Sequence, residues 1–154
     1  QFMTDKIKGK QIVHSTTNGT KAILLAQQFS PQEIVIGAFV NIDTLKDYLI
    51  EKQTDVEIFC SGWKNTFSLE DTVFAGALSI KLQQEGGFEI KDDATFCAME
   101  LWQNSKDDLL SYLEKASHIH RLRKANLDDV FPYTFTLNSC HCFPILKDNK
   151  IIKA

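Results

Sequence analysis

The stretch that decides the fold is Lys10 to Phe29, which reads Lys-Gln-Ile-Val-His-Ser-Thr-Thr-Asn-Gly-Thr-Lys-Ala-Ile-Leu-Leu-Ala-Gln-Gln-Phe. Lys10 to Ser15 is a short β-type run, and Thr16-Thr17-Asn18-Gly19 ends it. Apolar residues then recur at the i, i+3, i+4, i+7 spacing of a helix, at Ala22, Leu25, Ala26 and Phe29. The stretch therefore predicts a strand, a turn and a helix in succession.

The same alternation continues along the first half of the chain. Glu33 to Gly37 has the pattern of a buried strand, and a second helix is striped by Ile42, Leu45 and Leu49. A third strand is expected at Asp55 to Ser61, followed by a helix that Ser68 caps and Gly86-Gly87 ends. Strands alternating with helices favour an α/β fold with a parallel or mixed sheet and helices on both faces.

The second half is expected to be more helical. One helix is marked by Ala94, Cys97, Ala98 and Leu101 with a cap near Asp92, and another by Leu109, Tyr112, Leu113 and Ala116 with Ser105 as cap. After Pro144, two short apolar runs flank Asp148-Asn149 and suit a C-terminal β-hairpin. Residues 1–154 are thus interpreted as a single α/β domain.

Composition excludes several classes of protein. With 44% hydrophobic and 24% charged residues in 154, the chain is typical of a globular domain. A net charge of −3, with Arg121 and Arg123 as the only arginines, argues against nucleic-acid binding, and no apolar stretch is long enough for a membrane span. The cysteines are expected to be reduced and the protein cytoplasmic, although the start on Gln1 predicts that a preceding segment was removed.

The turn after the first predicted strand has the groups of an anion-binding site. Gly19 permits close backbone approach, free N–H groups are expected at the helix start, and Thr16, Thr17 and Thr20 add hydroxyl donors around Asn18. Asn41 and Gly62 follow the next two strands, at the same predicted edge of the sheet. The alternatives are a type I′ hairpin turn at Asn18-Gly19, and a glycosylation sequon, which matters only in a secreted chain.

Glu70 and Asp71 are the candidate metal ligands. Both fall in the first turn of the helix that follows the third strand, where adjacent carboxylates can hold Mg²⁺. From the residue pattern alone a structural interpretation is favoured, because Ser68-Leu69-Glu70-Asp71 is also a helix-capping sequence. Zinc binding by His118-Ile119-His120 or Cys140-His141-Cys142 is disfavoured by the spacing, and no Walker A or dinucleotide-binding loop is present.

Together, Ser15-Thr-Thr-Asn-Gly-Thr-Lys-Ala22, Gly37-Ala-Phe-Val-Asn41, Ser61-Gly62 and Phe67-Ser-Leu-Glu-Asp71 resemble the 2-phosphosulfolactate phosphatase family. The resemblance implies an Mg²⁺-dependent phosphohydrolase that converts 2-phosphosulfolactate to sulfolactate and phosphate, a step toward coenzyme M. It also implies substrate binding by Thr16, Thr17, Asn18, Gly19, Thr20, Asn41 and Gly62. Glu70 and Asp71 become the catalytic, metal-side residues, which reverses the preference for a purely structural role.

The chain departs from the family in one respect. Family members normally begin with an additional α/β portion that carries an Asp-Val-x-Arg-Ala-type strand, which this sequence lacks, so the chain is expected to be the C-terminal part of a longer phosphatase. Two other hypotheses stay open. One is a non-catalytic fragment that binds an anion or metabolite, and the other is a homo-oligomer in which Trp63 and Phe67 are interface anchors.

Overall fold

The structure, a computed structural model, describes residues 5–10 and 16–154. The predicted first strand, Lys10 to Ser15, therefore lies outside the described residues except for Lys10. The helices are η1 (Asp5–Ile7), α1 (Gly19–Gln27), η2 (Phe39–Asn41), α2 (Ile42–Lys52), α3 (Leu69–Gly86), α4 (Asp93–Gln103), α5 (Leu109–Leu113), α6 (Ser117–Lys124), η3 (Asp128–Val130) and α7 (Phe131–Thr134). The strands are β1 (Pro144–Lys147) and β2 (Lys150–Lys153).

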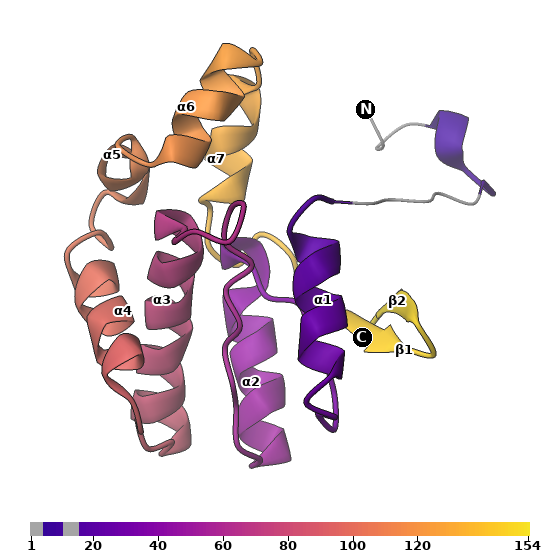
Figure 1. Ribbon diagram of the computed structural model, residues 1–154, viewed down its shortest axis with the longest axis vertical. Coiled ribbons are helices and arrows are strands. Elements are labelled where there is room, and N and C mark those ends of the chain that lie inside the picture. The colour runs from indigo at the N-terminus through magenta and orange to yellow at the C-terminus, as the bar shows by residue number, and fades with distance from the viewer. Residues whose placement is uncertain (1–4, 11–15) are drawn as a thin grey trace.

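The core is built around α3, which packs on α2 and α4 (Figure 1). Its buried positions include Val73, Ala77 and Leu82, and α2 contributes Ile42 and Leu45 to the same cluster. Gly76 allows α3 and α4 to approach closely, since a Cβ built on it would lie 1.9 Å from the backbone oxygen of Ala98. This stretch of α3 therefore fixes the distance between two neighbouring helices.

Most predicted helix ends are confirmed. Ser68 accepts a hydrogen bond from the Asp71 N–H, Asp92 accepts one from the Thr95 N–H, and Gly87 closes α3 with φ of 70°. The predicted cap of the next helix is wrong. Ser105 is buried and its hydroxyl donates to the Trp102 carbonyl, whereas Asp108 caps α5 by accepting from the Ser111 N–H. The cap shifts because the turn from 102 to 108 uses Ser105 for its own hydrogen bonds.

A parallel sheet is not formed within the described residues. Glu33 to Gly37 is extended, but Val35 forms an isolated antiparallel bridge with Ile145 of β1. Asp55 to Ser61 is extended without a paired neighbour. The C-terminal hairpin is confirmed, with Pro144 opposite Lys153 and Lys147 opposite Lys150, and its turn residues Asp148 and Asn149 both have positive φ.

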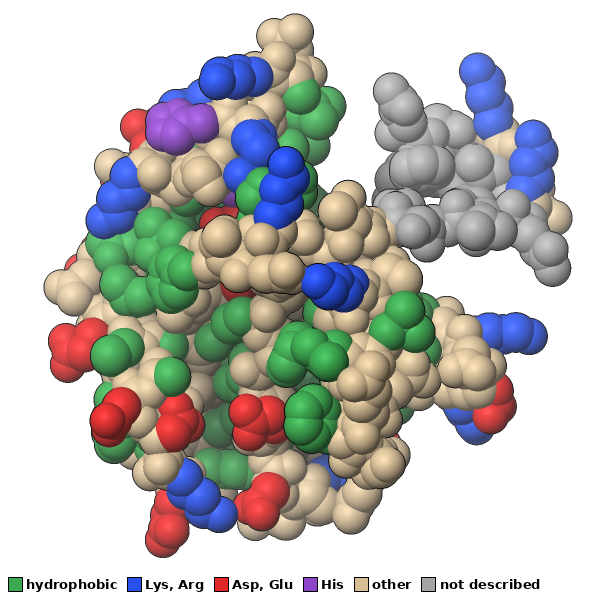
Figure 2. Space-filling view, viewed as in Figure 1, with side chains coloured by type: hydrophobic (Ala, Val, Ile, Leu, Met, Phe, Trp, Pro, Cys, Tyr) green, Lys and Arg blue, Asp and Glu red, His purple; other side chains and the backbone are tan. Residues whose placement is uncertain are grey.

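The helices α1, α2 and α3 all begin at the same end of the molecule (Figure 1). Their N-termini carry free N–H groups and the positive end of each helix dipole, which favour an anionic ligand at this end. The helix α1 has no buried residue, and Leu24 and Phe29 are 59% and 76% exposed. Hydrophobic side chains are visible on the face that carries α1 (Figure 2).

None of the described helices combines the length and the apolar character that crossing a membrane requires.

Candidate functional site

A tight loop, residues 61–67, lies between the N-termini of α1 and α3. Trp63 and Thr66 exchange two backbone hydrogen bonds, and Lys64 and Asn65 between them have φ of 50° and 63°, as in a type I′ turn. Gly62 enters the turn with φ of 65°, and a Cβ on it would lie 2.6 Å from the Thr66 carbonyl oxygen. Glycine is therefore required at 62 by the loop itself, whatever its role toward a substrate.

The turn before α1 is held by two threonines. The Thr16 N–H donates to the Thr20 hydroxyl at 3.2 Å, and the Thr20 N–H donates to the Thr16 hydroxyl at 3.1 Å. Gly19 fits beneath this pair because a Cβ there would lie 2.8 Å from Thr16 Oγ1. Asn18 and Gly19 lack positive φ, and Gly19 begins α1, so the alternative of a type I′ hairpin at Asn18-Gly19 is wrong.

Three backbone N–H groups at this turn are available to a ligand. The N–H groups of Thr17, Asn18 and Gly19 have no acceptor among the described residues, whereas that of Thr20 is bound by Thr16. The hydroxyls of Thr16 and Thr20 each accept a backbone N–H of the other residue, so their O–H groups, like that of Thr17, can still donate. Backbone N–H groups and threonine hydroxyls thus both offer donors at this turn.

The turn before α1 and the loop 61–67 are joined directly. Asn18 Oδ1 accepts from the Lys64 N–H at 3.2 Å, and Lys21 Nζ donates to Asn65 Oδ1 at 2.6 Å. Asn18 therefore does not cap its own helix but holds the neighbouring loop in place. The two segments are 44 residues apart in sequence at the Lys21–Asn65 contact.

Asp71 fastens the other side of the loop. Its Oδ2 accepts from the Gly62 N–H at 2.8 Å and from the Ser61 hydroxyl at 3.0 Å. Two of the predicted site residues, Gly62 and Asp71, are thus bonded to each other. The Asp71 carboxylate positions the loop, and one of its two oxygens is free of these bonds.

Glu70 faces a different set of groups, on α6. Its Oε1 lies 3.6 Å from His118 Nδ1, and the same nitrogen lies 3.0 Å from Arg121 Nη2. Arg121 can only donate, so His118 Nδ1 must be the acceptor in that contact and the neutral ring carries its proton on Nε2.

Arg121 also covers the loop. Its guanidinium lies 3.9 Å from the centroid of the Trp63 ring, and Lys64 Nζ lies 5.8 Å from the same centroid. Trp63 is half-buried by this stacking, whereas Phe67 is 68% exposed. Lys21, Lys64 and Arg121 thus all contact residues of this loop, and Arg121 reaches Glu70 through the His118 ring between them.

Sequence reasoning missed Arg121 and His118 as members of this site. Arg121 enters only the argument on nucleic-acid binding, and His118 enters only the zinc alternative. The spacing of His118 and Arg121, three residues apart on one helix, places both on one face and is the local signal that was available. The approach of that face to Glu70 depends on the fold of α4 and α5, which no local pattern specifies.

The remaining predicted residues lie elsewhere or have other neighbours. Asn41 is buried and its Oδ1 accepts from the Ala38 N–H, and none of its recorded hydrogen bonds reaches residues 16–20. Residues 5–10 and 16–154 contain no group of three or more His, Cys, Asp or Glu placed to hold a metal. Desolvation, and then the Asp71 carboxylate, raise the pKa of the nearby Cys60 thiol, which disfavours a thiolate nucleophile.

The turn at Lys64-Asn65 provides a test of the loop. Asn65→Ala is expected to lower the free energy of unfolding by about 1 kcal/mol, because alanine tolerates positive φ poorly. Asn65→Gly keeps the turn and removes only the Lys21 contact. Chemical denaturation should therefore rank wild type and Asn65→Gly above Asn65→Ala, and equal losses in the two variants would contradict the turn geometry.

The chain is thus a helix-rich domain in which two helix N-termini, three cations and an acidic pair lie around one loop. The chain belongs to the 2-phosphosulpholactate phosphatase family, whose family model matches residues 1–149.

Curated relatives agree with this assignment. A probable 2-phosphosulfolactate phosphatase of Microcystis aeruginosa is 35% identical over 151 residues, covering 96% of this chain and 61% of the relative. Proteins described in the same words from Caldanaerobacter subterraneus and Synechocystis are 28% and 37% identical, over 96% and 82% of this chain and 60% and 53% of their own lengths. The chain thus spans about three-fifths or less of these relatives.

Proposed function

We propose that the chain provides the substrate- and metal-binding part of a phosphatase for a small acidic phosphoester such as 2-phosphosulfolactate, releasing phosphate and sulfolactate. The observation that carries this proposal is the convergence on loop 61–67, which lies beside two helix N-termini and is contacted by Lys21 and Arg121, with Glu70 and His118 next to Arg121. Phosphoryl transfer needs this combination, since catalysis rests on positioning and on neutralising charge. The names of the relatives support the same substrate class.

The substrate's phosphate fits the turn before α1. Free N–H groups of Thr17, Asn18 and Gly19 donate to its oxygens, and the dipole of α1 favours its charge. Lys21 stands on the same turn and is held by Asn65, so its charge stays at this end of the helix. Gly62 contributes by shaping the neighbouring loop, and Asn41 by holding its own turn at Ala38, rather than through a contact with this turn.

The second anion of the substrate requires a separate donor. Arg121 has a planar guanidinium with several N–H groups, and its stacking on Trp63 fixes the plane. A sulfonate or carboxylate held there would lie on the opposite side of the loop from the α1 turn. The site therefore favours a substrate with two separated negative groups.

Mg²⁺ fits the carboxylates of this site. Mg²⁺ is commonly held by one or two carboxylates together with substrate phosphate oxygens and waters. A Mg²⁺ site therefore does not require the larger acidic cluster that the described residues lack. Glu70 is the residue that would hold the ion directly, and Asp71 would contribute its oxygen that is free of loop contacts. When bound, Mg²⁺ neutralises phosphate oxygens and activates a water.

His118 lies between Arg121 and Glu70 and contacts both side chains. As a neutral ring it accepts from Arg121, which keeps the guanidinium over Trp63. The same nitrogen, Nδ1, lies 3.6 Å from Glu70 Oε1. His118 therefore stands between the candidate metal ligand Glu70 and the second anion-binding group, Arg121.

The proposed substrate also suggests a metabolic pathway and a cellular location. Sulfolactate formation belongs to coenzyme M biosynthesis or a related sulfonate pathway, which places the protein in the cytoplasm. A homo-oligomer is compatible with the 68% exposed Phe67 beside the loop.

Phosphate release tests the proposal. The substrates are 2-phosphosulfolactate, a phosphoester with carboxylate in place of sulfonate, and p-nitrophenyl phosphate, each with Mg²⁺ or with EDTA. The chain is assayed alone and together with the part of the Microcystis relative that lies outside the match. Mg²⁺-dependent release that prefers the doubly anionic substrates is expected, whereas equal release in EDTA would contradict the metal role.

A non-catalytic role is the second candidate. It is favoured by one observation, namely that the match covers only 61% of the Microcystis relative. This candidate predicts that 2-phosphosulfolactate binds the chain and that substitution of Arg121 weakens binding. It also predicts no phosphate release in either form of the assay.

A further inference from the structure

Two extended segments of the chain have unused backbone edges. They are Val56 to Ser61 and Glu89 to Lys91, and within the described residues no N–H or C=O of either segment makes a backbone hydrogen bond. Extended backbone without a ladder exposes a row of donors and acceptors that readily pairs with another strand. Both segments therefore resemble unpaired edge strands, whose backbone groups can pair with another strand.

Each segment has the side-chain alternation of a half-buried strand. Val56 and Ile58 are half-buried and pack against the core, while Glu57 and Phe59 between them are exposed. In the second segment Ile90 is half-buried and its neighbours Glu89 and Lys91 are exposed. The alternation shows that both segments present one face to the helices and the other outward.

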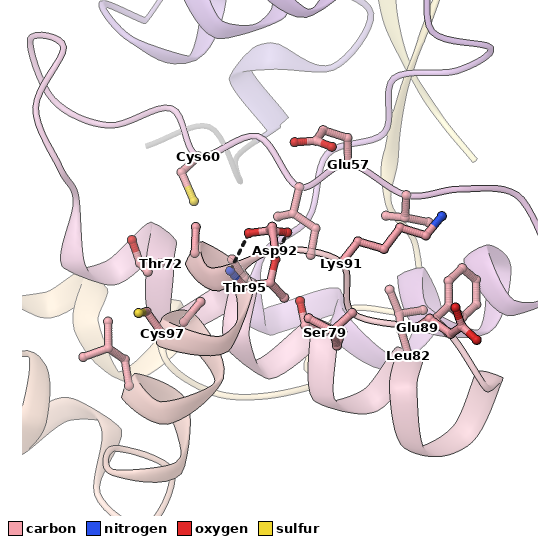
Figure 3. Close-up of a pocket in the computed structure, with 18 of the residues that line it drawn as sticks. Glu57, Cys60, Thr72, Ser79, Leu82, Glu89, Lys91, Asp92, Thr95 and Cys97 are labelled. Atoms are coloured by element: carbon pink, nitrogen blue, oxygen red, sulfur yellow. Dashed lines mark hydrogen bonds between the residues drawn. The ribbon is translucent and has the colours of Figure 1, made fainter.

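A groove of about 570 Å³ separates the two segments. Its walls are the two segments, and small residues of α3, Ala75 and Ser79, contribute to its lining. Figure 3 shows Cys60 on one side of the groove and Asp92 and Thr95, at the start of α4, on the other. The groove thus combines two strand edges with an inner surface that leaves room for larger side chains.

The connection between the segments is that of a crossover unit. The chain leaves Ser61, passes through α3 and returns as the second segment before α4. In such a unit the two strands lie side by side or with further strands between them. Lys91 forms an ion pair at 3.5 Å with Asp55, the residue before the first segment, and both side chains are at least 70% exposed, so the pair adds little stability.

We propose that the groove is the docking site of a β-strand from the portion of the family's sequence that this chain does not match. The match leaves more than a third of the Microcystis relative outside it, ample length for such a strand. A strand in the groove would pair with both edges at once and bury its apolar face over Ala75 and Ser79. The uncovered apolar residues of α1, Leu24 and Leu25, are consistent with further contacts from the same portion.

Hydrogen exchange tests the docking. The part of the Microcystis relative outside the match is produced together with this chain, and amide exchange is compared with that of the chain alone. Amides in 56–61 and 89–91 are expected to exchange freely in the chain alone and at least about tenfold more slowly in the complex. No complex, or a complex with protection confined to other segments, would overturn the proposal.

A pair of variants localises the contact. Ser79→Leu places a larger side chain in the groove and is expected to abolish the protection, whereas Ser111→Leu adds the same side chain at an exposed position outside it. Retained protection in Ser79→Leu would count against the groove. Should Ser79→Leu fail to fold, the protection of 56–61 and 89–91 in the wild-type complex decides whether a strand docks there. Protection of the chain alone that grows with its concentration would show a second copy as the occupant and overturn the chosen partner.

Discussion

Replacing Glu70 by glutamine is expected to lower Mg²⁺-dependent phosphate release by roughly 10²- to 10⁴-fold, the usual range for a group that acts on the reacting atoms. Glutamine keeps the size of the side chain but removes the charge that would hold Mg²⁺. It also removes the carboxylate charge that lies 3.6 Å from His118 Nδ1. The measurement is the steady-state rate at several Mg²⁺ concentrations, in the form of the protein that is active in the phosphate-release assay.

Asp93→Asn is the matched control for Glu70→Gln. Asp93 also stands in the first turn of a helix, α4, so both substitutions remove a similar favourable interaction with a helix dipole. Only Glu70 has His118 as a neighbour. Comparable rates in the two variants would mean that Glu70 stabilises its helix and takes no part in the reaction.

Gly76→Ala is expected to have the largest effect on stability, with a loss of about 3 kcal/mol or more in the free energy of unfolding. Alanine normally favours a helix over glycine by about 1 kcal/mol. Here the new Cβ would lie 1.9 Å from the Ala98 oxygen and 2.3 Å from its carbonyl carbon. Both are backbone atoms of α4, so the clash is relieved only when the two helices separate.

Gln84→Ala is the matched control in the same helix, because it introduces alanine without a clash against α4. Gln84 is exposed near the end of α3, so its replacement is expected to change the unfolding free energy by no more than about 0.5 kcal/mol. The two variants are compared by chemical denaturation followed by circular dichroism. A Gly76→Ala protein as stable as Gln84→Ala would contradict the close approach of α3 and α4.

Local chemistry made the helices and the hairpin predictable. Ser68 and Gly87 bound α3 because a side-chain oxygen and a left-handed residue satisfy its end groups. Asp148 and Asn149 fix the register of the hairpin for the same reason, since both adopt positive φ. Ser105 was mistaken for a cap because a short polar side chain also stabilises turns, and the pattern does not distinguish the two.

The sheet could not be predicted in the same way. Alternation at Val56 and Ile58 records which face is buried, but it carries no information on which backbone edge pairs with which. Val35 illustrates the difference, since its segment pairs with Ile145, over a hundred residues away in the chain, rather than with the next predicted strand. A parallel arrangement was inferred from the order of elements alone.

One half of the candidate site could be predicted from local sequence. Free N–H groups and carboxylates at helix starts have a chemical meaning, which pointed to the residues before α1 and at the start of α3, and their ligand roles stay a prediction. Arg121 and His118 were not proposed for the site because they reach Glu70 through the packing of later helices. The structure adds that Thr16 and Asn18 also hold the turn and the neighbouring loop.

The stacking of Arg121 on Trp63 gives the site an optical reporter of its own. The chain has two tryptophans, and the other, Trp102, lies 6.0 Å from Phe39 in the aromatic part of the core. A guanidinium that moves from Trp63 toward a bound anion would change the charge above that indole, so we expect ligand binding to alter the Trp63 emission while Trp102 stays in the same surroundings. Intrinsic fluorescence would then follow ligand binding, with Trp102 as an internal reference in the same molecule.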